Sequence, residues 1–314
     1  MTLESVTHRY RFPWIALALA LMALPVSGAE GRRLKIVTSI APLYSWATSV
    51  AGSQADVENL LPADVSPHDY QLRPRDLRKL KSADILFFNG LGLESWVGTV
   101  LAANDPTATR KIVDVATGIA TNQLIYEIPD LGFGASDAES HPHSSQANPH
   151  LWLDPRYARH GVTNLLLALQ REDPANAAAY ATNAARYLGT LEKLEGDLRT
   201  SLSPLTKHQV VTFHDAFPYF CRRFGLILVG VIEEVPGTSP SPRYLAELSA
   251  AIRAKSVGVL FLEPQSDPRL ARQLSTDLGI AVAQLDTLET GRLAPEAYEE
   301  GMRANLRVLR TALK

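Results

Sequence analysis

The hydrophobic positions of the chain alternate between two spacings. From about residue 33, short runs of Val, Ile, Leu and Phe alternate with longer segments whose apolar residues recur at helical spacing. Strands separated by helices of this length are typical of βαβ units with a parallel sheet. The predicted strands are 34–38, 56–60, 84–88, 111–115, 209–213, 227–232, 257–262 and 281–285. The predicted helices include 42–51, 73–82, 93–103, 217–224, 242–255, 268–278 and 295–313.

One long helical segment divides these alternating halves. Residues 155–200 read as almost wholly helical, and Pro174 fits the first turn of a helix that follows Asp173. The part from 174 to 200 would be roughly 40 Å long at 1.5 Å per residue. The predicted fold is therefore α/β, with two Rossmann-like βα lobes of parallel sheets joined by one long rigid helix. The expected parts are 30–170 for the first lobe, 171–203 for the linking helix and 204–314 for the second lobe.

The amino terminus has the pattern of a secretory signal. Arg9 and Arg11 precede an apolar run, 14–26, that ends in small residues and is short for a membrane span. We expect residues 1–29 to be a cleaved signal peptide. Because no cysteine stands directly after the apolar run, we expect a periplasmic protein without a lipid anchor.

Composition narrows the function further. Cys221 is the only cysteine, which excludes an intramolecular disulfide and a zinc site made of cysteines; its aromatic neighbours predict a buried position. Removing Arg9, Arg11 and Glu4 from 31 basic and 33 acidic residues leaves 29 and 32. A slightly acidic chain does not favour a nucleic-acid partner.

Three histidines stand where predicted elements end. His68 follows the second strand, His150 closes a Gly- and Pro-containing segment, and His214 follows an apolar strand directly. Glu263 and Asp286 also come directly after predicted strands. Ligands of open α/β sheets bind beyond the carboxyl ends of the strands, so these side chains can meet at one rim.

Such a set is suited to a divalent metal. Three neutral imidazoles and a carboxylate form a tetrahedral Zn²⁺ site, and the same ligands accept Mn²⁺ or Fe²⁺. Each imidazole needs an acceptor for its second nitrogen, and Asp69, Asp154 and Asp215 are candidates by sequence. The spacing of the three histidines along the sequence matches no compact metal-binding motif. A purely structural role for them is therefore the alternative to a metal site at this point.

Several segments resemble one family over essentially all of residues 30–314: the zinc/manganese solute-binding proteins of ABC transporters, called cluster A-I. The segments that carry the resemblance are Pro67-His68-Asp69-Tyr70, Asn89-Gly90-Leu91-Gly92, Asn148-Pro149-His150-Leu151-Trp152, Phe213-His214-Asp215-Ala216-Phe217, Phe261-Leu262-Glu263-Pro264 and Leu285-Asp286.

The resemblance implies a metal held between the lobes by His68, His150, His214 and Asp286. It also implies a monomer that is not an enzyme and that delivers the ion to an inner-membrane permease. Histidine at the position of His214 favours zinc over manganese. In this chain Thr287 follows Asp286 where the family usually has proline, so Glu263 or a water is the alternative fourth ligand.

Residues 118–148 are expected to form a mobile surface loop in the first lobe, because they are rich in Gly, Pro and polar residues. Zinc members of the family often carry a longer loop rich in histidine and acidic residues here. Only Asp137, Glu139, His141 and His143 correspond to it. They predict either a weak secondary metal site at His141 and His143 or a solvated linker.

Three other functions remain as alternatives. A manganese- or iron-specific binding protein would have the same fold, and an adhesin could also use it. A secreted zinc hydrolase would use three histidines, a water and Glu263 as base, but the sequence has no His-Glu-x-x-His run.

The Gly90-Leu91-Gly92 segment has Ser95 where a dinucleotide fingerprint needs its third glycine, so it predicts a strand-to-helix turn.

Overall fold

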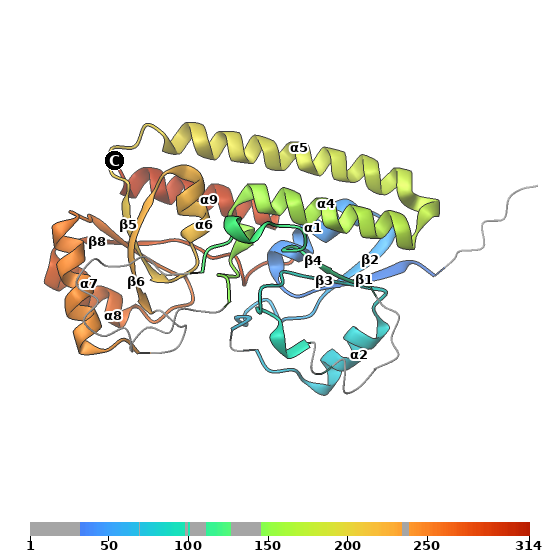
Figure 1. The fold of residues 1–314 in the computed structure, drawn as a ribbon, viewed down its shortest axis with the longest axis horizontal. Coiled ribbons are helices and arrows are strands. Elements are labelled where there is room, and N and C mark those ends of the chain that lie inside the picture. Colours follow the sequence, from blue (N-terminus) through green and yellow to red (C-terminus); the bar gives the residue numbers. More distant parts are fainter. Residues whose placement is uncertain (1–31, 69, 98–99, 101–110, 127–145, 234–238) are drawn as a thin grey trace, which may run out of the picture. The chain divides into compact units, whose positions relative to one another are not determined.

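Two four-stranded sheets, each entirely parallel, organise the chain (Figure 1). The computed structural model describes residues 32–314 except 69, 98–99, 101–110, 127–145 and 234–238. The first sheet has the order β2-β1-β3-β4 and consists of β1 (Leu34–Thr38), β2 (Ala55–Asn59), β3 (Ile85–Phe88) and β4 (Lys111–Asp114). The second has the order β6-β5-β7-β8 and consists of β5 (Gln209–His214), β6 (Ile227–Glu233), β7 (Val259–Leu262) and β8 (Ala281–Gln284).

The inner strands explain why both sheets are parallel. All four residues of β3 and all four of β7 are buried, as expected for strands covered by helices on both faces. β3 pairs in parallel with β1 through Val37 and Leu86, and β7 pairs in parallel with β5 through Val211 and Leu260. The predicted α/β class and the eight predicted strands are confirmed, each within two residues of its bounds.

Proline sets the start of most helices. It is the first residue of α2, α4, α6, α7 and α8, where its missing N–H costs no hydrogen bond. The helices that lie wholly within the described residues are α1 (Ala41–Ala51), α2 (Pro74–Ser82), α4 (Pro155–Glu172), α5 (Ala177–Leu202), α6 (Pro218–Phe224), α7 (Pro242–Ala254), α8 (Pro268–Leu278) and α9 (Ala297–Ala312), with short 3-10 turns η1 (Thr121–Gln123), η2 (Leu151–Leu153) and η3 (Pro174–Asn176). The helix predicted over 93–103 lies partly outside the described residues, as does the loop predicted over 118–148. The signal peptide predicted over 1–29 lies wholly outside them.

The long helical segment is two helices. α4 ends at Glu172 and η3 leads into the 26 residues of α5, which are roughly 39 Å long at 1.5 Å per residue. The reversal is held at Asp173, whose carboxylate accepts hydrogen bonds from Asn176 and Tyr180 at 2.7 and 2.8 Å. α4 and α5 therefore pack side by side, and α5 extends alongside both sheets (Figure 1).

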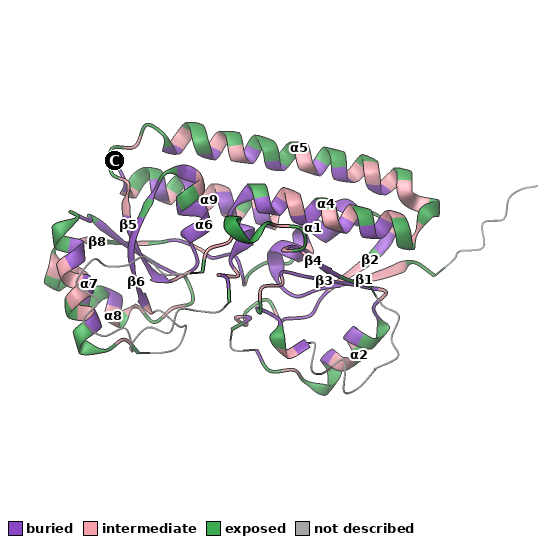
Figure 2. Cartoon of the chain, viewed as in Figure 1, coloured by how far each residue is buried: buried purple, intermediate pink, exposed green. Residues whose placement is uncertain are grey.

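One hydrophobic core runs through both sheets. It contains Trp46 of α1, which is fully buried and lies against Phe87 of β3 and Tyr298 of α9. It continues through α4, α5, α6 and α9, whose buried faces are purple in Figure 2. A second, smaller cluster packs α7 and α8 against the second sheet. Because the main core is shared, residues Arg33–Lys314 form one compact unit.

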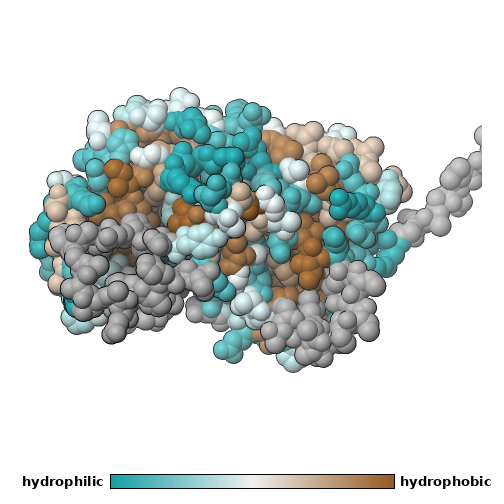
Figure 3. Space-filling model, viewed as in Figure 1, coloured by the Kyte–Doolittle hydropathy of each residue, from teal (hydrophilic) through white to brown (hydrophobic). Residues whose placement is uncertain are grey.

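The surface carries hydrophobic residues in separate places. Large exposed apolar side chains lie on different elements, including Ile112 on β4, Leu167 on α4 and Ile227 on β6. On the face drawn in Figure 3, hydrophobic patches are likewise interrupted by hydrophilic side chains. Within the described residues, every helix is too short or too polar to span a bilayer. Cys221 is buried in α6, as predicted, and burial raises the pKa of its thiol to about 12.

Candidate metal centre

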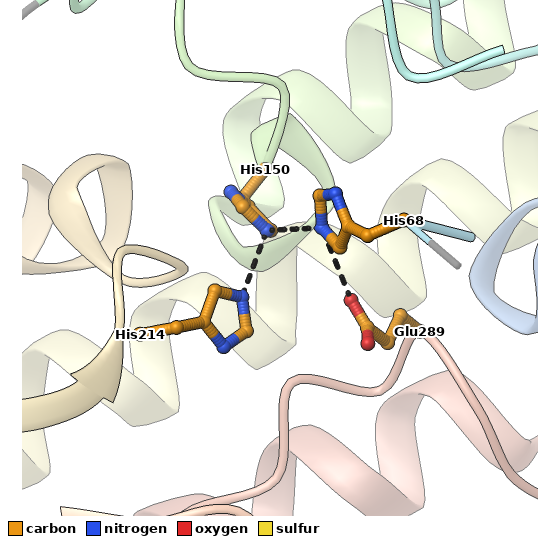
Figure 4. Close-up of side chains that lie close together, drawn as sticks. All are labelled: His68, His150, His214 and Glu289. Carbon is orange, nitrogen blue, oxygen red and sulfur yellow. Dashed lines mark hydrogen bonds and ion pairs between the residues drawn. The ribbon is translucent and has the colours of Figure 1, made fainter. Parts of the chain in front are cut away.

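Three histidines from three separate segments converge on one point (Figure 4). His68 comes from the segment after β2, His150 from the residue before η2, and His214 from the last position of β5. The Nε2 atom of His150 lies 3.3 Å from Nε2 of His68 and 3.1 Å from Nε2 of His214. Segments far apart in the sequence thus present the same ring nitrogen to a common centre.

The fourth member of the group is Glu289, in the segment between β8 and α9. Its Oε2 atom lies 3.7 Å from Nε2 of His68, and one ligand atom from each of the four residues falls within 4.8 Å of the others. That oxygen is buried and has no hydrogen-bond partner among the described residues. A buried carboxylate oxygen without a partner is costly, and a bound cation would supply the missing interaction.

These spacings match a tetrahedral metal. Zn–N bonds of about 2.0–2.1 Å at tetrahedral angles place two ligand nitrogens about 3.3 Å apart. The two Nε2–Nε2 distances, 3.3 and 3.1 Å, are close to this value. Three imidazoles and one carboxylate also complete four-coordination without a solvent ligand. The donor set therefore fits zinc in both chemistry and dimensions.

Each of two histidines is oriented through its other nitrogen. Nδ1 of His214 contacts Oε1 of Glu263, and Nδ1 of His150 lies 3.0 Å from Oδ1 of Asn148. Both partners are acceptors, so each Nδ1 carries the proton and donates it, which leaves a lone pair on each Nε2. Two lone pairs facing each other at 3.1 Å repel unless a proton or a metal ion lies between them.

Burial shapes the protonation of the group. His150, His214 and Glu289 are at most 4% exposed, whereas His68 lies nearer the surface. Burial, with the neighbouring His214, lowers the pKa of His68 to about 4, and burial holds the pKa of His150 well below its usual value. Burial also raises the pKa of Glu289 to about 7.

His214 behaves differently from the other two histidines. Desolvation alone would lower its pKa, but the hydrogen bond and negative charge of Glu263, with the charge of Glu289, outweigh it and raise the pKa. Two of the imidazoles are therefore neutral over the whole physiological range, and His214 is the one that holds a proton most readily in the absence of metal.

The structure brings the three predicted histidines together but does not add Asp286 to them. Oδ1 of Asp286 accepts a hydrogen bond of 2.8 Å from the backbone N–H of Leu288 and so closes a turn. Leu288 has a positive φ of 60°, and this turn carries Glu289 to the centre instead. Glu263, the alternative ligand, contacts His214 from behind rather than joining the group.

Sequence reasoning gave the fourth position to Asp286 or Glu263, which directly follow predicted strands, and the imidazole partners to aspartates, so it missed Glu289 and Asn148. Of the acceptors expected from sequence, Asp154 pairs with Arg223 and Asp215 accepts from Asn148. Asp69 lies outside the described residues. So do His141 and His143, whose predicted secondary site therefore stays a prediction.

With the geometry described, comparison with known proteins places the chain. Residues 36–312 match the family model described as zinc-uptake complex component A, periplasmic. The chain belongs to this family. The resemblance to the zinc/manganese solute-binding proteins is thereby confirmed at the level of the family.

Curated relatives of the chain include proteins described as zinc-uptake and zinc-binding proteins. The chain is 28% identical over 298 residues to the high-affinity zinc uptake system protein ZnuA of Bacillus subtilis, covering 91% of this chain and 89% of the relative. It is 28% identical over 294 residues to the zinc-binding protein AdcA of Streptococcus pyogenes. That match covers 90% of this chain but only 56% of AdcA, so the chain spans about half the length of that relative.

Solved structures with the same fold include metal-bound proteins. A Zn(II)-bound mutant variant of AdcAII of Streptococcus pneumoniae has a TM-score of 0.77 and 27% identity over 90% of this chain and 100% of that one. FpvC of Pseudomonas aeruginosa, solved in complex with Mn2+, has a TM-score of 0.76 and 27% identity over 90% of this chain and 98% of that one. A crystal structure of a ZnuA protein has a TM-score of 0.75 and 28% identity over 90% and 100%.

Proposed function

We propose that this chain captures one zinc-class divalent cation between its two sheets and delivers it to the permease of an ABC transporter. The ligands we propose are His68, His150, His214 and Glu289. The observation that carries the proposal is the convergence of three Nε2 atoms at tetrahedral spacing beside an unpartnered buried carboxylate oxygen. The cation is cargo, and the protein holds it without changing it.

The composition of the centre favours zinc as the cargo. Imidazole suits zinc, whereas magnesium and calcium prefer oxygen ligands. The zinc-uptake and zinc-binding descriptions of the family and of ZnuA and AdcA agree with this preference. Selectivity over Mn²⁺ rests on geometry, because four ligands favour zinc and manganese prefers more.

A closed centre argues against the hydrolase alternative. Catalytic zinc sites keep three protein ligands and leave a position for water. Here Glu289 stands at the fourth position, and Glu263, which a hydrolase would need as a base, is engaged by His214 and by Gln265 at 3.1 Å. Neither carboxylate is therefore available to activate water in this arrangement.

The family supports the proposed compartment and partner. The family description is periplasmic, and delivery to a membrane permease requires a protein outside the cytoplasmic membrane. We propose secretion by the amino-terminal signal, release without a lipid anchor and action as a monomer. The first lobe, the linking helix and the second lobe keep their predicted bounds of 30–170, 171–203 and 204–314 in this proposal.

Metal titration tests the proposal. The chelator-stripped protein, titrated with Zn²⁺ and Mn²⁺ in competition, is expected to bind one Zn²⁺ tightly, and His214→Ala should weaken binding strongly. His160 on α4, whose ring contacts the carbonyl of Thr117 at 2.7 Å, provides the matched control, and His160→Ala should bind as the unaltered protein does. Tighter Mn²⁺ would change the cargo but leave the centre in place. Absence of any tight ion would show that the histidines are structural.

A further inference from the structure

Asn148 connects the two halves of the metal centre with one side chain. Its Oδ1 accepts from the backbone N–H of His150 and from Nδ1 of the same residue, both at 3.0 Å. Its Nδ2 donates to the backbone carbonyl and to Oδ2 of Asp215, both at 2.8 Å. Asp215 directly follows His214, so a single amide lies between two of the proposed ligands.

The orientation of this amide is dictated by its partners. A backbone N–H can only donate, so the oxygen of Asn148 must face His150. A carbonyl and a carboxylate can only accept, so the nitrogen must face Asp215. An aspartate, serine or alanine at this position could not satisfy both sides at once.

The backbone of Asn148 is held just as firmly. Its N–H donates to the carbonyl of Ile125 at 2.6 Å, and its carbonyl accepts from Oη of Tyr219 at 2.9 Å. That hydroxyl accepts from the N–H of Ile125 at 3.1 Å and belongs to fully buried Tyr219 on α6. The residue therefore cannot shift without breaking contacts to the first and second halves of the chain together.

We propose that Asn148 is a positioning residue for the metal centre. It fixes the Nδ1–H tautomer of His150, and its contact with Asp215, called the latch below, connects His150 to the segment carrying His214. The inference deepens the proposed function and rests on it. A preset tautomer keeps the Nε2 lone pair directed at the ion, and the latch keeps the two nitrogens at tetrahedral spacing. Release of the ion requires the rings of His150 and His214 to move apart, so the Asn148–Asp215 contact slows dissociation.

Two substitutions separate the effect of the His150 tautomer on zinc binding from the effect of the contact with Asp215. Asn148→Ala removes both the acceptor for His150 and the donor to Asp215. Asn148→Asp keeps an oxygen toward His150 but turns a second oxygen toward Asp215, where it repels. Asn164 on α4, whose amide bridges the backbone carbonyls of Asp114 and Thr117, supplies the control Asn164→Ala.

The experiment measures zinc affinity and dissociation, with the ¹⁵N shifts of His150 in the metal-free protein. Asn148→Ala should lose roughly 10- to 100-fold in affinity, mainly through faster dissociation, and should show mixed tautomers. Asn148→Asp should keep the Nδ1–H tautomer yet release zinc faster than the unaltered protein. Asn164→Ala should change neither the affinity and dissociation of zinc nor the tautomer of His150.

The outcomes that overturn the inference differ from those that overturn the function. If the unaltered protein binds zinc tightly and Asn148→Ala matches it in dissociation rate and tautomer, Asn148 is no positioning residue, while the proposed function stands. If Asn148→Asp releases zinc at the unaltered rate, the latch is refuted. If the unaltered protein binds no zinc, the function itself fails. Thermal unfolding of each variant verifies that it is folded.

Discussion

At the scale of single residues, two carboxylates three positions apart have different tasks. Asp286 follows β8 closely and uses its carboxylate to close a turn on Leu288. Glu289 lies beyond that turn, and its Oε2 faces the histidines without a hydrogen-bond partner among the described residues. A residue can thus shape a metal centre without facing the ion. The distinction can be tested with isosteric amides.

Glu289→Gln should weaken zinc binding at least about tenfold, because it removes the negative charge from the fourth ligand position. Asp286→Asn should have a small effect, since its Oδ1 can still accept from Leu288. Competition against a chelator measures both. Equal losses of zinc affinity in the two variants, or a larger loss in Asp286→Asn, would show that Asp286 is a ligand.

The pH dependence of zinc affinity should be governed by His214 and Glu289. The pKa of His214 is raised and the pKa of Glu289 is raised to about 7, so protons compete with the ion at both side chains. The pKa of His68 is lowered to about 4, and the pKa of His150 lies well below its usual value. Affinity should therefore fall as pH falls, because the ion must displace the protons of His214 and Glu289. Replacing Glu263 by Gln removes the charge that raises the pKa of His214, so the part of the fall that comes from His214 should begin at a lower pH. Dissociation constants measured from about pH 5 to about pH 8 cover this range. A zinc affinity that does not change with pH would contradict the assignment of these side chains as ligands.

At the scale of elements, α4 and α6 are joined by a buried ion pair. Asp154 is 1% exposed; it caps α4 by accepting from the N–H of Arg156 at 2.9 Å. It also accepts two bonds of 2.9 Å from Nε of Arg223 on α6. Burial tends to raise the pKa of Asp154, and the hydrogen bond and charge of Arg223 oppose this. The cap that starts α4 therefore also attaches it to the second half of the chain.

Arg223→Met should destabilise the protein by about 3 kcal/mol, because it leaves a buried carboxylate without its cation. Chemical denaturation measures the free energy of unfolding. Arg269 pairs with Asp267 on the surface, so Arg269→Met is the matched control and should change stability little. A loss in Arg223→Met no larger than in the control would show that the pair contributes nothing net.

At the scale of the whole molecule, the two sheets share one hydrophobic core. Trp152 illustrates the sharing: its Nε1 donates to the carbonyl of Thr287 at 2.7 Å, and its own carbonyl accepts from Oη of Tyr298 at 2.7 Å. A further contact crosses at Ser45, whose hydroxyl donates to the carbonyl of Pro295. These contacts attach the first half of the chain to the second and oppose their separation.

Because the core is shared, residues 33–314 should unfold in a single transition whose calorimetric and van't Hoff enthalpies agree. Zinc at about 100 times its dissociation constant should stabilise the protein by about 2.7 kcal/mol and raise the midpoint temperature. Scanning calorimetry with and without zinc, and with Mg²⁺ as the control ion, measures this. Two separate transitions would mean that the sheets unfold independently.

Particular residues show how far the sequence predicted the structure. Strand positions followed from hydrophobic runs such as Ile85–Phe88, since buried parallel strands tolerate few polar residues. A helix start at Pro174 after Asp173 was predicted, but the reversal of direction there was not, because Pro174 fits the first turn of a helix whatever its angle to the helix before it. The place of the three histidines at element ends indicated a common rim, and the family resemblance implied that they hold the metal together.

The sequence by itself predicted the two parallel sheets and the long helix, because periodicity is a local property, and it predicted the three histidines through strand ends and the family resemblance. The tertiary structure decided which carboxylate lies beside the histidines, the contact of His214 with Glu263 and the contact of Asn148 with Asp215. Glu289 reaches the centre through a positive φ at Leu288, and Asn148 meets Asp215 across 67 positions of the chain. Such meetings depend on packing of distant segments against one core, which no local spacing encodes.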